Sequence, residues 1–97
     1  MEKTHIEQQF NKAYLENFSR LKRFACEYVV SPADAENILH DVFLMLWERR
    51  FELFTDEDLT GYLLVSTRNK CIDLIRKRMR ELEAGKELQE EYFITLK

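Results

Sequence analysis

Basic side chains gather in the stretch Thr67–Arg80, which reads TRNKCIDLIRKRMR. Its six Lys and Arg residues face a single acid, Asp73, which gives a local charge of +5 in a chain whose net charge is −3. Cations at this density suit a polyanion, because neutralising phosphates releases the counterions condensed on a nucleic acid. Asn69, in the same stretch, carries an amide of the kind that reads a base edge. The stretch is therefore a candidate nucleic-acid surface.

Charge is segregated along the whole chain. Residues 1–33 carry +1, residues 34–67 carry −6, residues 68–80 carry +5 and residues 81–97 carry −3. The acidic middle contains only two bases, Arg49 and Arg50. Such segregation predicts two different partners, or two faces that meet a charged protein and a charged polymer.

The residues needed for catalysis or metal binding are not brought together by the sequence. The only glycines are Gly61 and Gly85, so a glycine-rich phosphate loop is excluded. Glu36 and His40 could place two ligands on one helical turn, but the sequence offers no third ligand. Cys26 and Cys71 lack the CxxC spacing, and we expect both to be small buried hydrophobic residues. We predict a protein that is not an enzyme and has neither cofactor nor metal.

Length and composition bound the fold that positions these residues. The chain has 97 residues, two glycines, one proline and 45% hydrophobic residues. One domain with one modest core follows from the length, and helices with short connections follow from the composition. We expect an all-α fold, a small bundle of three to four helices. Neither a membrane-spanning run nor an apolar N-terminal signal is evident, so we expect a cytoplasmic protein.

Two helices are predicted in the first half of the chain. Thr4–Glu7 resembles a capping box, and apolar residues then recur at helical spacing to about Val30. Ser31 suits the N-cap and Pro32 the first position of a second helix, which we expect to reach Arg49 or Arg50.

An irregular loop and a third helix are predicted in the second half. Residues 51–60, FELFTDEDLT, have no clear period, and we expect a loop with one short helical turn near Thr55. The third helix begins between Leu59 and Gly61, and its buried stripe is expected to consist of Leu64, Cys71, Ile72, Ile75 and Met79. The opposite stripe is expected to consist of Asn69, Asp73, Arg76 and Arg80. Residues 81–97 are predicted to be a weak helix or a tether.

Two stretches of the chain resemble, in their order and spacing, domain 2 of bacterial extracytoplasmic-function sigma factors. They are SPADAENILHDVFLMLWERR and YLLVSTRNKCIDLIRKRMR. These proteins belong to the sigma-70 family of RNA polymerase specificity subunits. The resemblance covers roughly residues 9–80. It implies a domain of residues 1–80 that supports transcription initiation, followed in 81–97 by the start of an interdomain linker. Asn37 and His40 depart from the usual Asp and Gln of the family pattern, although both remain polar.

The resemblance implies two binding surfaces. The second helix would dock on the clamp helices of the polymerase β′ subunit, through Asn37, His40, Asp41, Phe43 and Trp47. The third helix and the preceding loop would bind the non-template strand of the −10 promoter element, with an extruded base held beside Asn69. The residues implied in DNA binding are Tyr62, Arg68, Asn69, Arg76, Lys77 and Arg80. An anti-sigma factor is a further partner that the family often has, and we expect a monomer.

Other interpretations stay open on sequence alone. A solvated basic helix in a small bundle needs no partner. A helical adaptor could bind other proteins through the face that carries Trp47 and through the apolar tail Tyr92–Leu96. A helix-turn-helix reader of duplex DNA fits less well, because its short turn between two helices is missing. The second, −35-reading domain of the family does not follow Lys97, so we expect either a fragment or an unusually short sigma factor.

Overall fold

The computed structural model describes residues 5–55 and 58–96, and the side chains of that range up to residue 86. In this part of the chain there are four helices and no strand. They are α1 His5–Ala25, α2 Pro32–Glu48, α3 Arg50–Leu53 and α4 Leu59–Leu96. The all-α prediction is confirmed.

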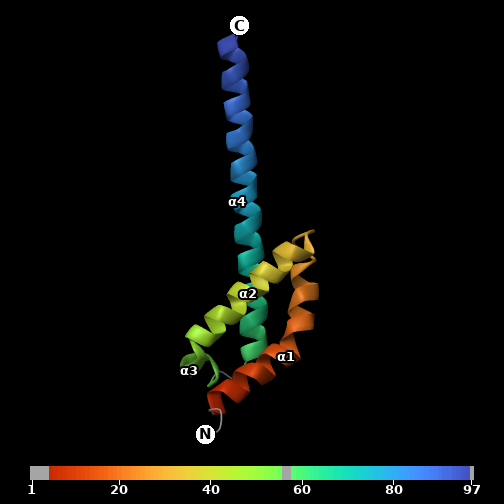
Figure 1. The fold of residues 1–97 in the computed structure, drawn as a ribbon, viewed down its shortest axis with the longest axis vertical. Coiled ribbons are helices and arrows are strands. Elements are labelled where there is room, and N and C mark those ends of the chain that lie inside the picture. The colour runs from red at the N-terminus through yellow and green to blue at the C-terminus, as the bar shows by residue number, and fades with distance from the viewer. Residues whose placement is uncertain (1–4, 56–57, 97) are drawn as a thin grey trace.

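Three helices form the bundle, and the longest one leaves it. α1 and α2 meet at the turn between them and pack on the first half of α4, whereas the second half of α4 projects away from them (Figure 1). The molecule therefore measures 72 × 24 × 22 Å. Residues 81–96, predicted as a weak helix or a tether, continue α4 as one uninterrupted helix.

The boundary between α1 and α2 follows from local chemistry. Ser31 has an extended backbone, and its side chain accepts a hydrogen bond from the amide of Asp34, 3.3 Å away, while Pro32 opens the helix. Ser31 and Pro32 thus reduce the number of unpaired amide groups in the first turn of α2, and the predicted start of this helix is confirmed. α1, however, ends at Ala25 and not near Val30, because the chain tightens there: the amides of Tyr28 and Val29 both donate to the carbonyl of Ala25.

The core lies where α1, α2 and the first half of α4 meet. Its fully buried large side chains are Leu21, Leu39, Leu46, Leu63, Val42, Thr67 and Cys71. Aromatic rings close one side, where Phe43 contacts Tyr14 and Phe10 contacts Trp47 at ring-centroid distances of 4.8 Å and 5.2 Å. Among the described residues, thirteen buried hydrophobic side chains hold the bundle together, and they come from all four helices and from the turn after α1.

Several burial predictions for the third main helix and the cysteines need correction. Met79 was predicted to be buried but is 57% exposed, because it lies where α4 has left the bundle. Leu64, Ile72 and Ile75 are only partly buried, and the fully buried line on α4 is Leu63, Thr67 and Cys71. Cys71 is buried as expected, but Cys26 is exposed in the turn after α1.

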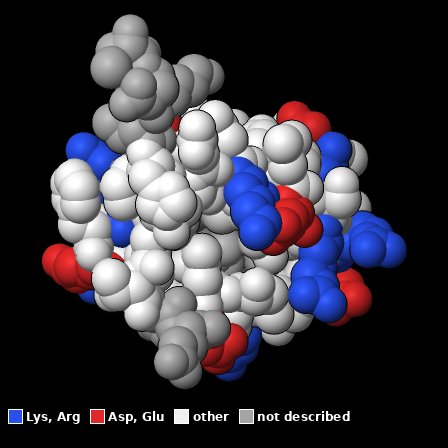
Figure 2. Space-filling model, turned by 90° about the horizontal axis from the view of Figure 1, so that it is seen from below, with Lys and Arg blue, Asp and Glu red and all other residues white. Residues whose placement is uncertain are grey.

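The end of the molecule seen from below carries charges of both signs. Figure 2 shows blue and red side chains interspersed there among broad uncharged areas. The basic stretch, residues 67–80, lies further along α4. This end therefore looks like an ordinary solvated surface.

Candidate functional site

The polar face of α4 is exposed, as its helical spacing predicted. Asn69, Asp73, Arg76 and Arg80 are all exposed, and Lys77 beside them is exposed too. Arg68 donates from Nη1 to Oδ1 of Asn69 at 3.4 Å, so a cation lies next to the amide. Cationic and amide groups thus share one side of one helix, which suits contact with a phosphate backbone and a base edge.

The arginines of the basic stretch differ in their contacts. Arg78 points back to the bundle and donates from Nη1 and Nη2 to the two carboxylate oxygens of Asp34 on α2, the second bond measuring 2.9 Å. This hydrogen bond lowers the pKa of the Asp34 carboxyl below its ordinary value. Arg76, in contrast, has no ion pair with any described residue. Helical spacing places Arg76 on the polar stripe and Arg78 off it, but it does not predict the contact of Arg78 with Asp34.

Tyr62, in the first turn of α4, is held from the end of α2. Arg49 donates from Nη1 to the Tyr62 hydroxyl, and the hydroxyl donates to Sδ of Met45, 3.8 Å away. Arg49 also donates from Nε and Nη2 to Oε2 of Glu52, at 3.3 Å and 2.9 Å. Tyr62 is partly buried against the core. Sequence reasoning missed Arg49, although it is one of two bases in an acidic segment.

Polar residues implied in polymerase binding lie on the surface of α2. Asn37, His40 and Asp41 are exposed. Trp47 is partly buried, with its ring against Phe10. Phe43 is only 4% exposed and packs in the core, so a direct contact through its side chain has no surface to use. The burial of Phe43 contradicts the prediction that its side chain takes part in this contact.

A hollow of about 340 Å³ joins the α2 surface to the α4 surface. α2 contributes Asn37 and Asp41 to it, and α4 contributes Lys70 and Asp73. The ion pair between Asp34 and Arg78 also belongs to its lining. The hollow therefore lies between the implied polymerase surface, which contributes Asn37 and Asp41, and the part of α4 that carries the basic stretch.

The segment before α4 contains one short helix, at a different place from the helical turn that the sequence predicted. Its helical turn is α3, Arg50–Leu53, and not a turn near Thr55. Leu53 is 4% exposed, whereas Phe51 is 67% exposed with the guanidinium of Arg50 4.7 Å from its ring centroid. The apolar side chains of this segment are therefore divided between the core and the surface.

Two of the four acidic residues in the segment before α4 have partners within the chain. Glu52 pairs with Arg49, and Asp58 accepts a hydrogen bond from the amide of Gly61 at 3.2 Å, at the start of α4. Their charges are thereby partly offset by a cation and by the positive end of a helix. The remaining acids, Asp56 and Glu57, lie outside the described residues.

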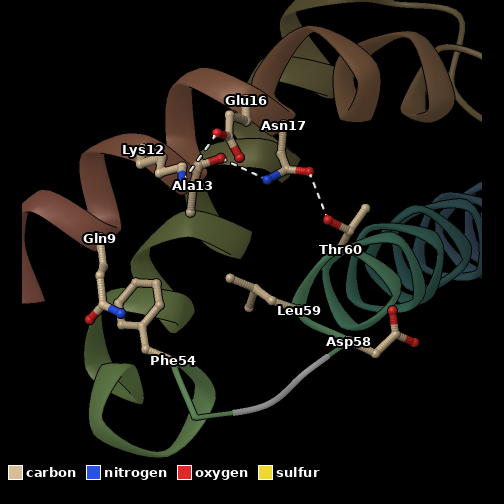
Figure 3. A pocket seen from close by; sticks show the side chains of 9 residues that line it. All are labelled: Gln9, Lys12, Ala13, Glu16, Asn17, Phe54, Asp58, Leu59 and Thr60. Atoms are coloured by element: carbon tan, nitrogen blue, oxygen red, sulfur yellow. Dashed lines mark hydrogen bonds and ion pairs between the residues drawn. The ribbon is translucent and has the colours of Figure 1, made fainter.

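A second hollow, of about 360 Å³, opens between α1 and the start of α4 (Figure 3). Asn17 sits at its inner end, where Nδ2 donates to the carbonyl of Ala13 at 2.9 Å and Oδ1 accepts from Thr60 at 3.4 Å. Phe54 and Leu59 supply apolar lining. Asn69 is not among its nine lining residues, so the amide implied in base binding and this hollow are separate.

Two absences concern the described part of the chain only. No group of three His, Cys, Asp or Glu side chains there could hold a metal ion. None of its helices has the length and apolarity needed to cross a membrane.

Comparison with known proteins gives one result. The family model described as Sigma-70 region 2 matches residues 13–81. The comparison with curated proteins and the comparison with solved structures each found no significant match. The matched range contains α2, α3 and the part of α4 that packs in the bundle.

Proposed function

Because the chain belongs to the sigma-70 region 2 family, we propose that it is the promoter-recognition domain of an extracytoplasmic-function sigma factor. Region 2 of a sigma factor binds core RNA polymerase and promoter DNA during transcription initiation. The observation that carries the proposal is the match over residues 13–81, which includes both candidate surfaces. The finer assignment to the extracytoplasmic-function group rests on the motifs DAENILHDVFLMLW and YLLVSTRNKCIDLIRKR.

The polymerase surface is proposed to be the exposed side of α2. Asn37, His40 and Asp41 would meet the β′ clamp helices, with Trp47 at the edge of the contact. The exposure of the three polar residues supports this assignment. The acidic charge of residues 34–67 also keeps this side electrostatically distinct from the basic stretch of α4.

The DNA surface is proposed to be the exposed side of α4 together with the segment before it. Arg68, Arg76, Lys77 and Arg80 would neutralise phosphates of the non-template strand, and Asn69 would bind an extruded base of the −10 element. Their exposure supports this role. Base extrusion costs a few kcal/mol, which contacts to the free base must return. Tyr62 would contribute an aromatic surface at the first turn of α4.

The remaining proposals follow from the same assignment. Residues 1–80 would form the functional domain and residues 81–97 the start of a linker. The protein would act in the cytoplasm as a monomer, without cofactor or metal, and an anti-sigma factor could cover the same surfaces.

The test is binding to a recombinant β′ clamp-helix fragment. We compare the wild-type chain with His40→Ala/Asp41→Ala, and with a matched double substitution at exposed positions of α1, Gln8→Ala/Glu16→Ala. Binding that is lost only in the α2 variant supports the proposal. A folded wild-type chain that does not bind the fragment, and does not bind core polymerase either, contradicts it.

The alternative role is a helical protein-binding adaptor that ignores nucleic acid. Single-stranded DNA binding separates the two roles, because the sigma-factor role requires an affinity that falls with salt and with Asn69→Ala. An adaptor gives neither dependence.

A further inference from the structure

The Tyr62 side chain is fixed by residues that lie outside its own helix. Its hydroxyl contacts Arg49 at the junction of α2 and α3, and Met45 in the last turns of α2. Its ring is partly buried against the core, and the Arg49 guanidinium lies 5.7 Å from the ring centroid. The orientation of Tyr62 is therefore set by the end of α2.

All three nitrogens of the Arg49 guanidinium already donate within the chain. Nε and Nη2 donate to Glu52, and Nη1 donates to Tyr62. Glu52, through its hydrogen bond, raises the pKa of Arg49 above the ordinary arginine value, so the group stays charged. Since the Glu52 carboxylate offsets that charge, the geometry of Arg49 suits orientation of a neighbour better than attraction of DNA.

Tyr62 begins a line of exposed or partly exposed residues along α4. Val65, 56% exposed, follows at three residues, and Asn69 follows at seven, so the three side chains share one side of the helix. An aromatic ring, an aliphatic side chain and an amide are the groups that hold an unstacked base by packing and by its polar edge.

We propose that Arg49 is a positioning residue for strand binding: it fixes Tyr62 in the orientation in which the ring meets an unpaired base of the promoter strand. This inference rests on the proposed function. Without Arg49, the Tyr62 hydroxyl loses its charged donor and the ring must be ordered when the strand binds. Ordering one side chain on binding weakens affinity by about two- to tenfold.

The test is a double-mutant cycle in strand affinity. The probe is a fluorescein-labelled, single-stranded oligodeoxynucleotide selected from a random-sequence pool on the full wild-type chain. Anisotropy titrations compare wild type, Arg49→Gln, Tyr62→Phe and the double variant. We expect each single substitution to weaken binding by about two- to tenfold. The double variant should bind no more weakly than the weaker single variant, because both changes break the same hydrogen bond.

Arg50→Gln is the matched control. It removes the same charge at the adjacent residue, but the hydrogen bond and ring contacts of Arg50 are made with Trp47 and Phe51. We expect the fold-changes in strand affinity caused by Arg50→Gln and by Tyr62→Phe to multiply in the double variant. Arg49→Lys keeps the charge and one donor nitrogen, so it should recover part of the lost affinity. Urea unfolding of each variant ensures that titrations are made where the protein is folded.

Each outcome has a definite meaning. The positioning role is established by two results together. The effects of Arg49→Gln and Tyr62→Phe on strand affinity are not additive, whereas those of Arg50→Gln and Tyr62→Phe are, and Arg49→Lys recovers part of the affinity. Equal effects of Arg49→Gln and Arg50→Gln, both multiplying with Tyr62→Phe, overturn it while leaving the strand-binding function intact. If selection on the folded wild-type chain enriches no oligonucleotide, the proposed function fails, and the positioning role fails with it.

Discussion

Arg78 of α4 and Asp34 of α2 form a two-pronged ion pair that joins two helices at residues 44 positions apart. At the opposite end of α2, Arg49 reaches Tyr62 at the start of α4. The two helices therefore run antiparallel, and contacts at both ends of α2 join it to the first half of α4. The ion pair with Asp34 removes Arg78 from the set of free cations.

The first prediction compares two neighbouring arginines in the basic stretch. Arg76→Gln should weaken binding of the wild-type-selected single-stranded oligonucleotide and reduce the salt dependence by about one counterion, because Arg76 is free to meet a phosphate. Arg78→Gln should have the smaller effect on affinity and the larger effect on thermal stability, because it breaks the contact with Asp34. Anisotropy titrations over a range of salt concentrations and thermal melts measure both. Equal losses of affinity would show that Arg78 leaves Asp34 to bind the strand.

The second prediction concerns the pH dependence of stability. The hydrogen bond from Arg78 lowers the pKa of Asp34 from its ordinary value of 3.8. A lowered pKa in the folded state means that the unfolded chain takes up the proton first. The stabilisation is therefore fully present above the unfolded pKa and is lost as the pH falls through the folded pKa. Urea unfolding of wild type and Asp34→Asn should give free energies that differ at neutral pH and converge below about pH 4.

The control for this pH effect is Asp73→Asn, because Asp73 forms no ion pair with any described residue. Its difference from wild type should vary less with pH. A constant difference between wild type and Asp34→Asn across the acid range would contradict the prediction.

The third prediction separates the two cysteines. Cys26 is exposed, whereas Cys71 is completely buried and burial raises the pKa of its thiol. Because the thiolate is the reactive form, a maleimide should modify Cys26 quickly and Cys71 only after unfolding. Mass spectrometry after timed labelling measures this, and Cys26→Ser should leave no fast-reacting thiol. Two fast thiols in the folded wild type would mean that the core around Cys71 opens readily.

Local chemistry explains which features could be predicted from the sequence. Ser31 and Pro32 mark the start of α2 through contacts within four residues. The Ser31 side chain accepts a hydrogen bond from the Asp34 amide, and Pro32 takes the first helical position, where no amide hydrogen is needed. The exposure of Asn69 and Arg76 follows from helical spacing alone. The failures concern tertiary placement: periodicity continues through Met79, but the bundle that would bury it ends earlier.

The interhelical contacts could not be predicted for the same reason. Helical spacing separates Arg78 from Arg76, but only the approach of α2 gives Arg78 its partner Asp34. Arg49 and Arg50 are adjacent, yet one reaches Tyr62 and the other covers Trp47. Such differences depend on how whole helices pack, and a charge pattern along one helix does not contain them.

The fourth prediction concerns the start of α4, where Asp58 caps the helix by accepting from the Gly61 amide. A Cβ added at Gly61 would clash with the carboxylate of Asp58, so a side chain there must displace the capping group. Asp58→Ala should cost about 1 kcal/mol in the free energy of unfolding, as other N-cap losses do. Gly61→Ala should gain little or lose stability in the wild type, because the alanine's helix propensity is offset by the lost cap.

The two substitutions at this cap should therefore not be additive. In the Asp58→Ala background the obstacle at Gly61 is gone, and Gly61→Ala should raise stability by up to about 1 kcal/mol. Urea unfolding of wild type, both single variants and the double variant measures the coupling. Gly85→Ala is the matched control, because nothing lies within 4 Å of a Cβ there and the same helix propensity acts alone. Equal effects of Gly61→Ala in the two backgrounds would show that the carboxylate moves aside without cost, and that Gly61 is not needed for the cap.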